Sequence, residues 1–173
     1  MPGFSQSAIF CAALAGVVAM GSPLRAEDSM PVSGTEILTN VEMHMIPSRA
    51  DAARQFGAAR WMGAISSPGW FDSMQSTATE MVLSDLQRGQ GQNQGDMVWI
   101  NNDGRLVGSY VVKTAFTVDE KTKTPKGTFE GTWQISEGSG RFAGVSGHGI
   151  VKGTFDGVEA SDQWSGTISG FRK

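Results

Sequence analysis

The sequence predicts an all-β domain of about eight short antiparallel strands, closed into a barrel or stacked as a sandwich. Three observations favour this fold class. Apolar residues recur mostly at every second position, which is typical of strands with one buried face. Segments rich in Gly, Asn, Asp and Ser separate these runs, and the chain contains 23 glycines. Apolar residues at helical spacing are rare along the chain.

The first 26 residues are predicted to be a signal peptide rather than part of the fold. Residues 8–20 form an uncharged apolar run that is too short to span a bilayer. Ala26 then precedes a polar segment that begins at Glu27, which suits cleavage after a small residue. We therefore expect a periplasmic or secreted protein with one β-barrel domain comprising residues 27–173. An uncleaved N-terminal anchor is the alternative.

Composition excludes several kinds of site. The single cysteine, Cys11, lies inside the apolar run, so residues 27–173 offer no thiol for a disulfide, a nucleophile or a metal ligand. The two histidines alone argue against a transition-metal centre. The formal net charge is −3, and neither sign forms a block. This balance argues against binding to nucleic acids or to anionic membranes.

The first part of the domain gives a mixed pattern. Residues 38–46 and 77–86 alternate apolar and polar side chains and predict strands. Residues 49–59 are the one candidate helix, because Ser48 and Asp51 have the spacing of a capping box. The following sequence ARWMGAI fits a strand equally well.

Two segments are predicted to be loops from their composition, namely residues 66–75 and 88–95. The first loop carries Trp70 and Phe71. We expect these aromatic side chains to pack against the domain, and the alternative is a lid over a cavity.

The clearest local element is a hairpin with strands at residues 97–100 and 106–118. Residues 101–104, with the sequence NNDG, supply the Asn and Gly that tolerate the positive φ values of a tight turn. Residues 128–135, 147–155 and 163–171 alternate in the same way and predict further strands. The sequence KGTFEG at residues 126–131 returns as KGTFDG at residues 152–157, at the separation expected of a β-meander.

The glycine-rich segment at residues 136–149, SEGSGRFAGVSGHG, is interpreted as a turn. Its glycines have the spacing G-x-G-x-x-x-G, one residue too wide for a dinucleotide-binding fingerprint, and a strand follows where that motif needs a helix. The sequence GVSGH has a histidine where a nucleophile elbow needs its last glycine. We expect Phe142 and Val145 to pin this turn to the core.

The same segment resembles two known families. EGSGRFAGVSGHG is similar to the G-G-[ST]-G-x-F-x-G-x-x-G segment of allene oxide cyclases and to the G-G-T-G-x-F segment of plant dirigent proteins. DMVWINNDGRLVGSYVVKT and KGTFEGTWQI look like the strands that precede that segment in these families. The resemblance implies a single antiparallel eight-stranded β-barrel with an apolar cavity, no cofactor and frequent trimers. It also implies chemistry that shapes a reactive lipid or phenolic intermediate.

The resemblance further points to Glu42 and His44 in the sequence VEMHMIP. In the cyclases an early strand presents a Glu and, two residues on, an Asn to the cavity; here His replaces Asn, and the cavity cysteine has no counterpart. Two residues this far apart on a strand share a face, so Glu42 and His44 could act as general acid and base or bind a polar ligand end. Alternatively Val41, Met43 and Met45 form the core face, and the pair meets solvent.

Strand parity predicts the residues that bind a ligand in the cavity: Tyr110, Val112, Phe116, Phe129, Trp133, Trp164 and Ile168. Arg141 is expected to pair with Glu137 on the surface, and His148 is expected to point outward. Two functions stay open. One is a module that binds a small apolar molecule, lipid-like or phenolic, and the other is a cofactor-free isomerase or cyclase. The lack of a convincing catalytic set favours binding.

Overall fold

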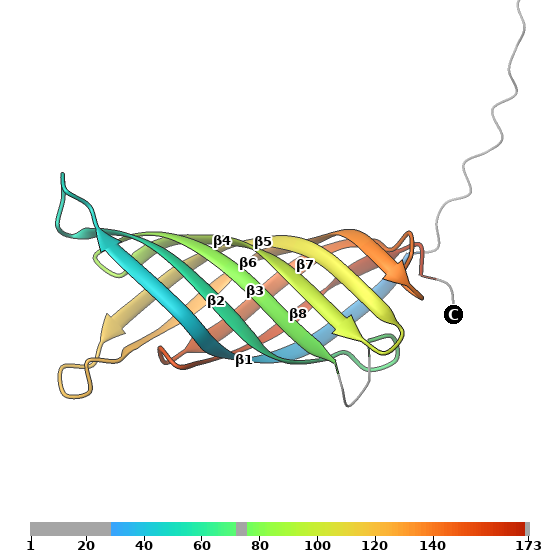
Figure 1. Ribbon diagram of the computed structural model, residues 1–173. Helices are drawn as coiled ribbons and strands as arrows, with labels where there is room; N and C mark the ends of the chain where they lie inside the picture. Colours follow the sequence, from blue (N-terminus) through green and yellow to red (C-terminus); the bar gives the residue numbers. More distant parts are fainter. Residues whose placement is uncertain (1–28, 72–75, 172–173) are drawn as a thin grey trace, which may run out of the picture.

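The structure, a computed structural model, describes residues 29–71 and 76–171 (Figure 1). These residues contain eight β-strands and no helix, and hence no helix that could cross a membrane. The expected signal peptide, residues 1–26, lies outside the described residues. The strands are β1 (Met30–Pro47), β2 (Arg54–Ser66), β3 (Thr77–Gln87), β4 (Gln90–Asn101), β5 (Gly104–Val118), β6 (Pro125–Gly140), β7 (Ser146–Phe155) and β8 (Glu159–Ser169).

The eight strands form one closed antiparallel sheet. Each strand pairs with its neighbours in sequence, and β1 also pairs with β8, so the sheet closes into a barrel (Figure 1). Closure gives each of the eight described strands a neighbour on both sides. The prediction of an all-β fold with eight antiparallel strands is confirmed, including the hairpin of β4 and β5.

Two predictions for the first part of the domain were wrong. The candidate helix at residues 49–59 is a turn followed by β2. Ser48 Oγ and Asp51 Oδ1 accept hydrogen bonds from backbone N–H groups two residues on, so the cap-like residues close a turn instead of a helix. The supposed loop at residues 88–95 contributes only Arg88 and Gly89 to a turn, both with positive φ, before β4 begins.

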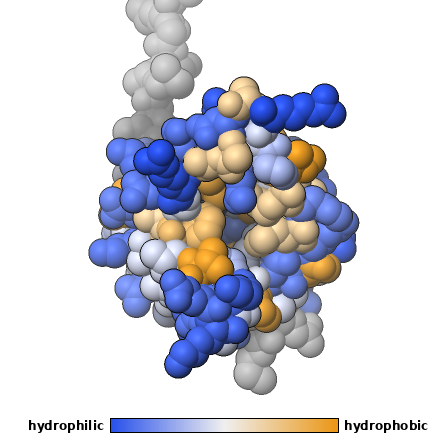
Figure 2. All heavy atoms as spheres, turned by 90° about the vertical axis from the view of Figure 1, so that its left-hand side faces the viewer, coloured by the Kyte–Doolittle hydropathy of each residue, from blue (hydrophilic) through white to orange (hydrophobic). Residues whose placement is uncertain are grey.

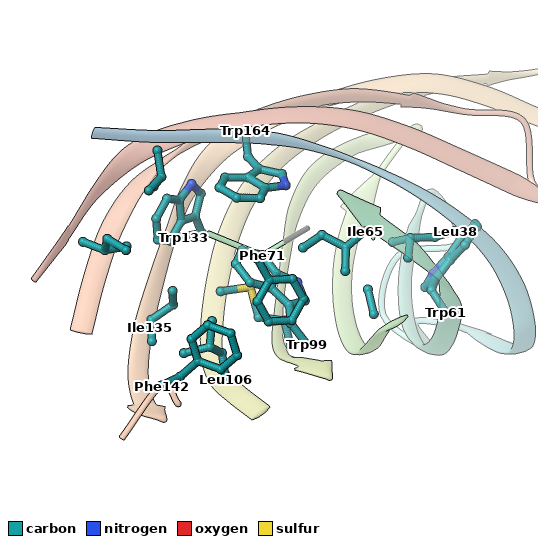
Figure 3. Close-up of a cluster of buried hydrophobic side chains, with 14 of the residues drawn as sticks. Leu38, Trp61, Ile65, Phe71, Trp99, Leu106, Trp133, Ile135, Phe142 and Trp164 are labelled. Carbon is teal, nitrogen blue, oxygen red and sulfur yellow. The ribbon is translucent and has the colours of Figure 1, made fainter. Parts of the chain in front are cut away.

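One end of the barrel is closed by side chains from two connections. Phe71 follows β2 and Phe142 lies between β6 and β7, and neither has any exposed area. Their ring centroids are 5.2 Å apart, and Trp70 packs edge-on against Phe142. Figure 3 shows Phe71 and Phe142 beside Trp99 and Leu106 in this core. The expectations that Trp70 and Phe71 pack against the domain and that Phe142 enters the core are confirmed.

A layer of three buried tryptophans lies next to this closed end (Figure 3). The Trp99 and Trp164 rings stack with centroids 4.9 Å apart, and Trp133 meets Trp164 edge-on at 5.7 Å. Gly149 and Gly166 make room for this layer, because a Cβ at either position would come within 2.6 Å of the Trp133 ring. The tryptophan layer therefore separates the filled end of the barrel from its other end.

Candidate functional site

The other end of the barrel is open and leads into a cavity of about 350 Å³. The turns after β1, β3, β5 and β7 surround this mouth. The walls are mainly apolar and include Leu38, Trp61, Val112, Phe116 and Phe129. Figure 2 looks onto this end, where apolar side chains surround a hollow and hydrophilic side chains project around them. The cavity thus offers an apolar interior behind a polar rim.

A smaller cavity of about 30 Å³ lies beside the large one and has room for about one water molecule. Glu80, Tyr110, Val112 and Phe129 border both cavities, so the small cavity adjoins the large one. Its remaining walls come from the tryptophan layer, Met97, Val151 and the acidic residues Glu36 and Asp162. We call the small cavity and its lining side chains the polar floor.

All but one of the residues that strand parity predicts to line the cavity border the large or the small cavity. Four of them line the large cavity: Tyr110, Val112, Phe116 and Phe129. Trp133 and Trp164 line the small cavity, as Tyr110, Val112 and Phe129 also do. Ile168 points inward but is fully buried at the closed end, and it borders neither cavity.

The polar floor brings three carboxyl groups together. Glu36 on β1 and Asp162 on β8 are directly paired across the ladder, and only 3% and 7% of their surfaces are exposed. Glu80 on β3 is half-buried because it borders the large cavity. Oε1 of Glu36 and Oδ1 of Asp162 have no hydrogen-bond partner. Among the described residues that line the two cavities there is no Lys, Arg or His.

Burial without a basic partner raises the pKa of all three carboxyl groups. Burial is the main cause for each of them, and repulsion between the carboxylates adds to it for Glu36 and Asp162. The pKa of Glu80 rises to about 7 and that of Asp162 to about 8. The pKa of Glu36 rises well above its usual range. Two of these groups therefore change charge near neutral pH.

Two polar contacts moderate the raised pKa of Glu80. Hydrogen bonding to Tyr110 and to Glu36 lowers its pKa and offsets part of the effect of burial. The same contacts raise the pKa of Tyr110 and of Glu36. Tyr110 and Glu36 are thus the immediate polar neighbours of Glu80.

Glu42 and His44 lie on the outer surface of β1. Their side chains are 58% and 71% exposed, and His44 Nε2 lies 2.9 Å from Glu42 Oε1. This hydrogen bond lowers the pKa of Glu42. Met43 and Met45 line the large cavity in their place. The pair therefore contacts solvent and does not reach the cavity.

A β-bulge explains this placement. Asn40 pairs with Trp61 and Glu42 pairs with Arg60, so the residue between them on β1 has no partner. Before the bulge the even-numbered residues Glu36 and Leu38 face inward; after it the odd-numbered methionines do. One extra residue moves each following side chain to the opposite face.

The three acids of the polar floor were not identified from the sequence. Each lies at an inward position of an alternating strand: Glu36 shares a face with Leu38, Glu80 with Val82, and Asp162 with Trp164. An acid at an inward position of an otherwise apolar face was the available signal.

Two other residues named from the sequence lie at the surface. Arg141 binds Asp103 at 3.2 Å and lies over the Phe171 ring, whereas Glu137 binds Arg105 at 2.9 Å. The expected pairing of Arg141 with Glu137 was therefore wrong, because the turn after β4 brings Asp103 closer to Arg141. His148 is exposed on β7, as expected.

No group of His, Cys, Asp or Glu within residues 29–71 and 76–171 is arranged to hold a metal ion. Comparison of the chain with family models, with curated proteins and with solved structures finds no match.

Proposed function

We propose that this protein binds one small, largely apolar molecule in the barrel cavity. The observation that carries the proposal is the cavity itself: about 350 Å³, open at one end, apolar along its walls and polar at its floor. Ligand sites in proteins commonly combine apolar walls with a few polar groups that orient the ligand. Eight-stranded barrels are just wide enough to hold one small ligand.

The arrangement favours an amphiphilic ligand, either lipid-like or phenolic. Its hydrocarbon part would contact Phe116, Phe129 and Val112, and its polar end would lie near Glu80 and Tyr110. Residues 1–26 have the features of a signal peptide, so we propose that binding takes place in the periplasm or outside the cell. The glycine-rich turn supports a relationship to allene oxide cyclases and dirigent proteins.

Saturable binding of a neutral apolar dye such as N-phenyl-1-naphthylamine tests the proposal. We expect one molecule of dye per barrel and displacement of the dye by fatty alcohols or phenolics. A parent protein that binds neither the dye nor any member of a broad panel of apolar compounds would overturn it.

One observation favours a second function, a cofactor-free isomerase or cyclase. The carboxyl group of Glu80 borders the cavity, contacts Tyr110 and has a pKa of about 7, which suits a general acid or base at neutral pH. If the protein is such an enzyme, Glu80→Gln should retain ligand binding and lose turnover. Glu42 and His44 would not take part, because they lie on the outer surface.

A further inference from the structure

The three acids of the polar floor have no cationic partner among the residues that the structure describes. Glu36 and Asp162 each have an unpaired carboxyl oxygen, and both residues are more than nine-tenths buried. Glu80 lies between them and the large cavity. Buried carboxylates are usually paired or hydrogen-bonded, because an unpaired charge in the interior is costly. The unpaired carboxyl oxygens lie around the small cavity that adjoins the large one, whereas the unpaired Asn93 Oδ1 and Thr114 Oγ1 belong to neutral side chains that line the large cavity itself.

Aromatic rings form much of the remaining wall of the polar floor, together with Met97, Val112 and Val151. Trp99, Trp133, Trp164 and Tyr110 all border the small cavity (Figure 3 shows the three tryptophans). Aromatic faces attract cations, and this attraction is larger where water is excluded. Carboxylates and aromatic rings around one small space are a combination that favours an ammonium group over an anion.

The size of the polar floor also restricts its occupant. The space of about 30 Å³ is suited to a group as small as a water molecule, such as a primary ammonium. The described acids are not arranged to hold a metal ion. An organic cation can still enter, because its hydrocarbon part has the adjoining large cavity.

We propose that the polar floor binds the ammonium group of an apolar primary amine, whose hydrocarbon part occupies the large cavity. This inference rests on the proposed function and specifies the chemical class of the ligand. The ammonium group donates hydrogen bonds to the carboxylates of Glu80 and Asp162 and to Oε1 of Glu36. It supplies the positive charge that the described lining of both cavities lacks.

Proton linkage follows from the groups around this site. They are Glu36 on β1, Glu80 on β3, Tyr110 on β5 and Asp162 on β8, with Trp99 on β4 next to Glu36. An amine remains protonated up to a pH of about 10. Its charge favours the carboxylate form of Glu80 and Asp162, so binding near neutral pH should release protons, and affinity should rise between pH 6 and 8.

Three probes with the same hydrocarbon tail test the proposal by isothermal titration calorimetry at pH 8: octylamine, octan-1-ol and octanoic acid. We expect octylamine to bind about tenfold tighter than octan-1-ol or better, as one hydrogen bond to a charged group would give. Octanoic acid should bind weakest. Repeating the octylamine titration at pH 7 in buffers of different ionisation enthalpy should show net proton release.

Two conservative variants locate the amine. Glu80→Gln and Asp162→Asn should each remove most of the preference for octylamine and leave the affinity for octan-1-ol nearly unchanged. Glu130→Gln is the matched control, because Glu130 is exposed on the outside of β6. Circular dichroism checks that each variant is folded. If a variant does not fold, the proton-release measurement on the parent protein still tests the inference.

The outcomes separate this inference from the proposed function. If octan-1-ol or octanoic acid binds as tightly as octylamine, the amine inference fails and binding in the cavity stands. If the preference for octylamine persists in both carboxamide variants, the amine binds elsewhere and the inference also fails. If none of the three probes binds but N-phenyl-1-naphthylamine does, the inference fails and the proposed function stands; only if the dye and the broader panel also fail to bind does the proposed function fail as well.

Discussion

Glu36 on β1 lies directly opposite Asp162 on β8, at the seam that closes the barrel, and both carboxyl groups are buried. Such a pair is unusual, because two buried acids repel each other when both are ionised. Repulsion from Asp162 contributes to the raised pKa of Glu36, after burial and the charge of Glu80. The interior of the barrel therefore favours the protonated, uncharged form of these carboxyl groups.

Stability should therefore fall as the pH rises. The pKa of Glu80 moves from 4.5 to about 7 on folding, and that of Asp162 from 3.8 to about 8. A carboxyl group with a raised pKa does not reduce the free energy of unfolding at a pH below its pKa in the unfolded chain. The reduction begins above that pH and keeps growing as the pH rises toward the pKa in the folded protein. The melting temperature at pH 9 should be lower than at pH 5 by about 5 °C or more. A higher melting temperature at pH 9 would contradict this account.

Replacing one buried acid should weaken this pH dependence. Asp162→Asn keeps the size of the side chain and removes its charge, so it should stabilise the protein at pH 9 and change little at pH 5. Differential scanning calorimetry of parent and variant at both pH values measures the difference. Equal shifts at the two pH values would show that ionisation of Asp162 does not limit stability.

The outer pair should be dispensable. Glu42→Gln and His44→Ala each alter an exposed side chain on the outside of β1, and we expect melting temperatures within about 2 °C of the parent. Ligand affinity should be unchanged between pH 5 and 8. A loss of affinity in either variant would place the pair in the site after all.

The closed end should be a main source of stability. Phe142→Ala removes a fully buried ring that contacts Phe71 and Trp70, and truncations of this kind cost about 3–5 kcal/mol. Phe56→Ala, at an exposed position on β2, is the control and should cost much less. Denaturant unfolding followed by tryptophan fluorescence compares the two variants. Similar losses in both would mean that the ring of Phe142 is not part of an essential core.

Period-two alternation was sufficient to predict most of the barrel. It identified the inward faces of β5 and β6. On these strands buried and exposed side chains alternate without interruption as far as Val112 and Trp133. On β1 it left open whether Glu42 and His44 or the neighbouring methionines face the cavity, and the bulge after Asn40 turns Glu42 outward. Bulges depend on pairing with a neighbouring strand, and a single strand sequence carries no direct signal of them.

The acids of the polar floor could not be predicted from the sequence for a different reason. Glu36, Glu80 and Asp162 are far apart in sequence, and an acid on a strand is ordinarily taken to face solvent. Only closure of the sheet between β1 and β8 brings Glu36 next to Asp162. The candidate site thus depends on tertiary contacts that local patterns do not reveal.

Blocking the cavity tests the central claim most directly. Val112 lines the cavity on β5, and its neighbour Val111 points outward and is 44% exposed. Val112→Trp should fill the space, and Val111→Trp adds the same ring to the outer surface. Titration with N-phenyl-1-naphthylamine, with folding of all three proteins verified by circular dichroism, should give saturable one-site binding to the parent and to Val111→Trp, and none to Val112→Trp. Equal binding by the two tryptophan variants, or no binding by the parent, would contradict the account.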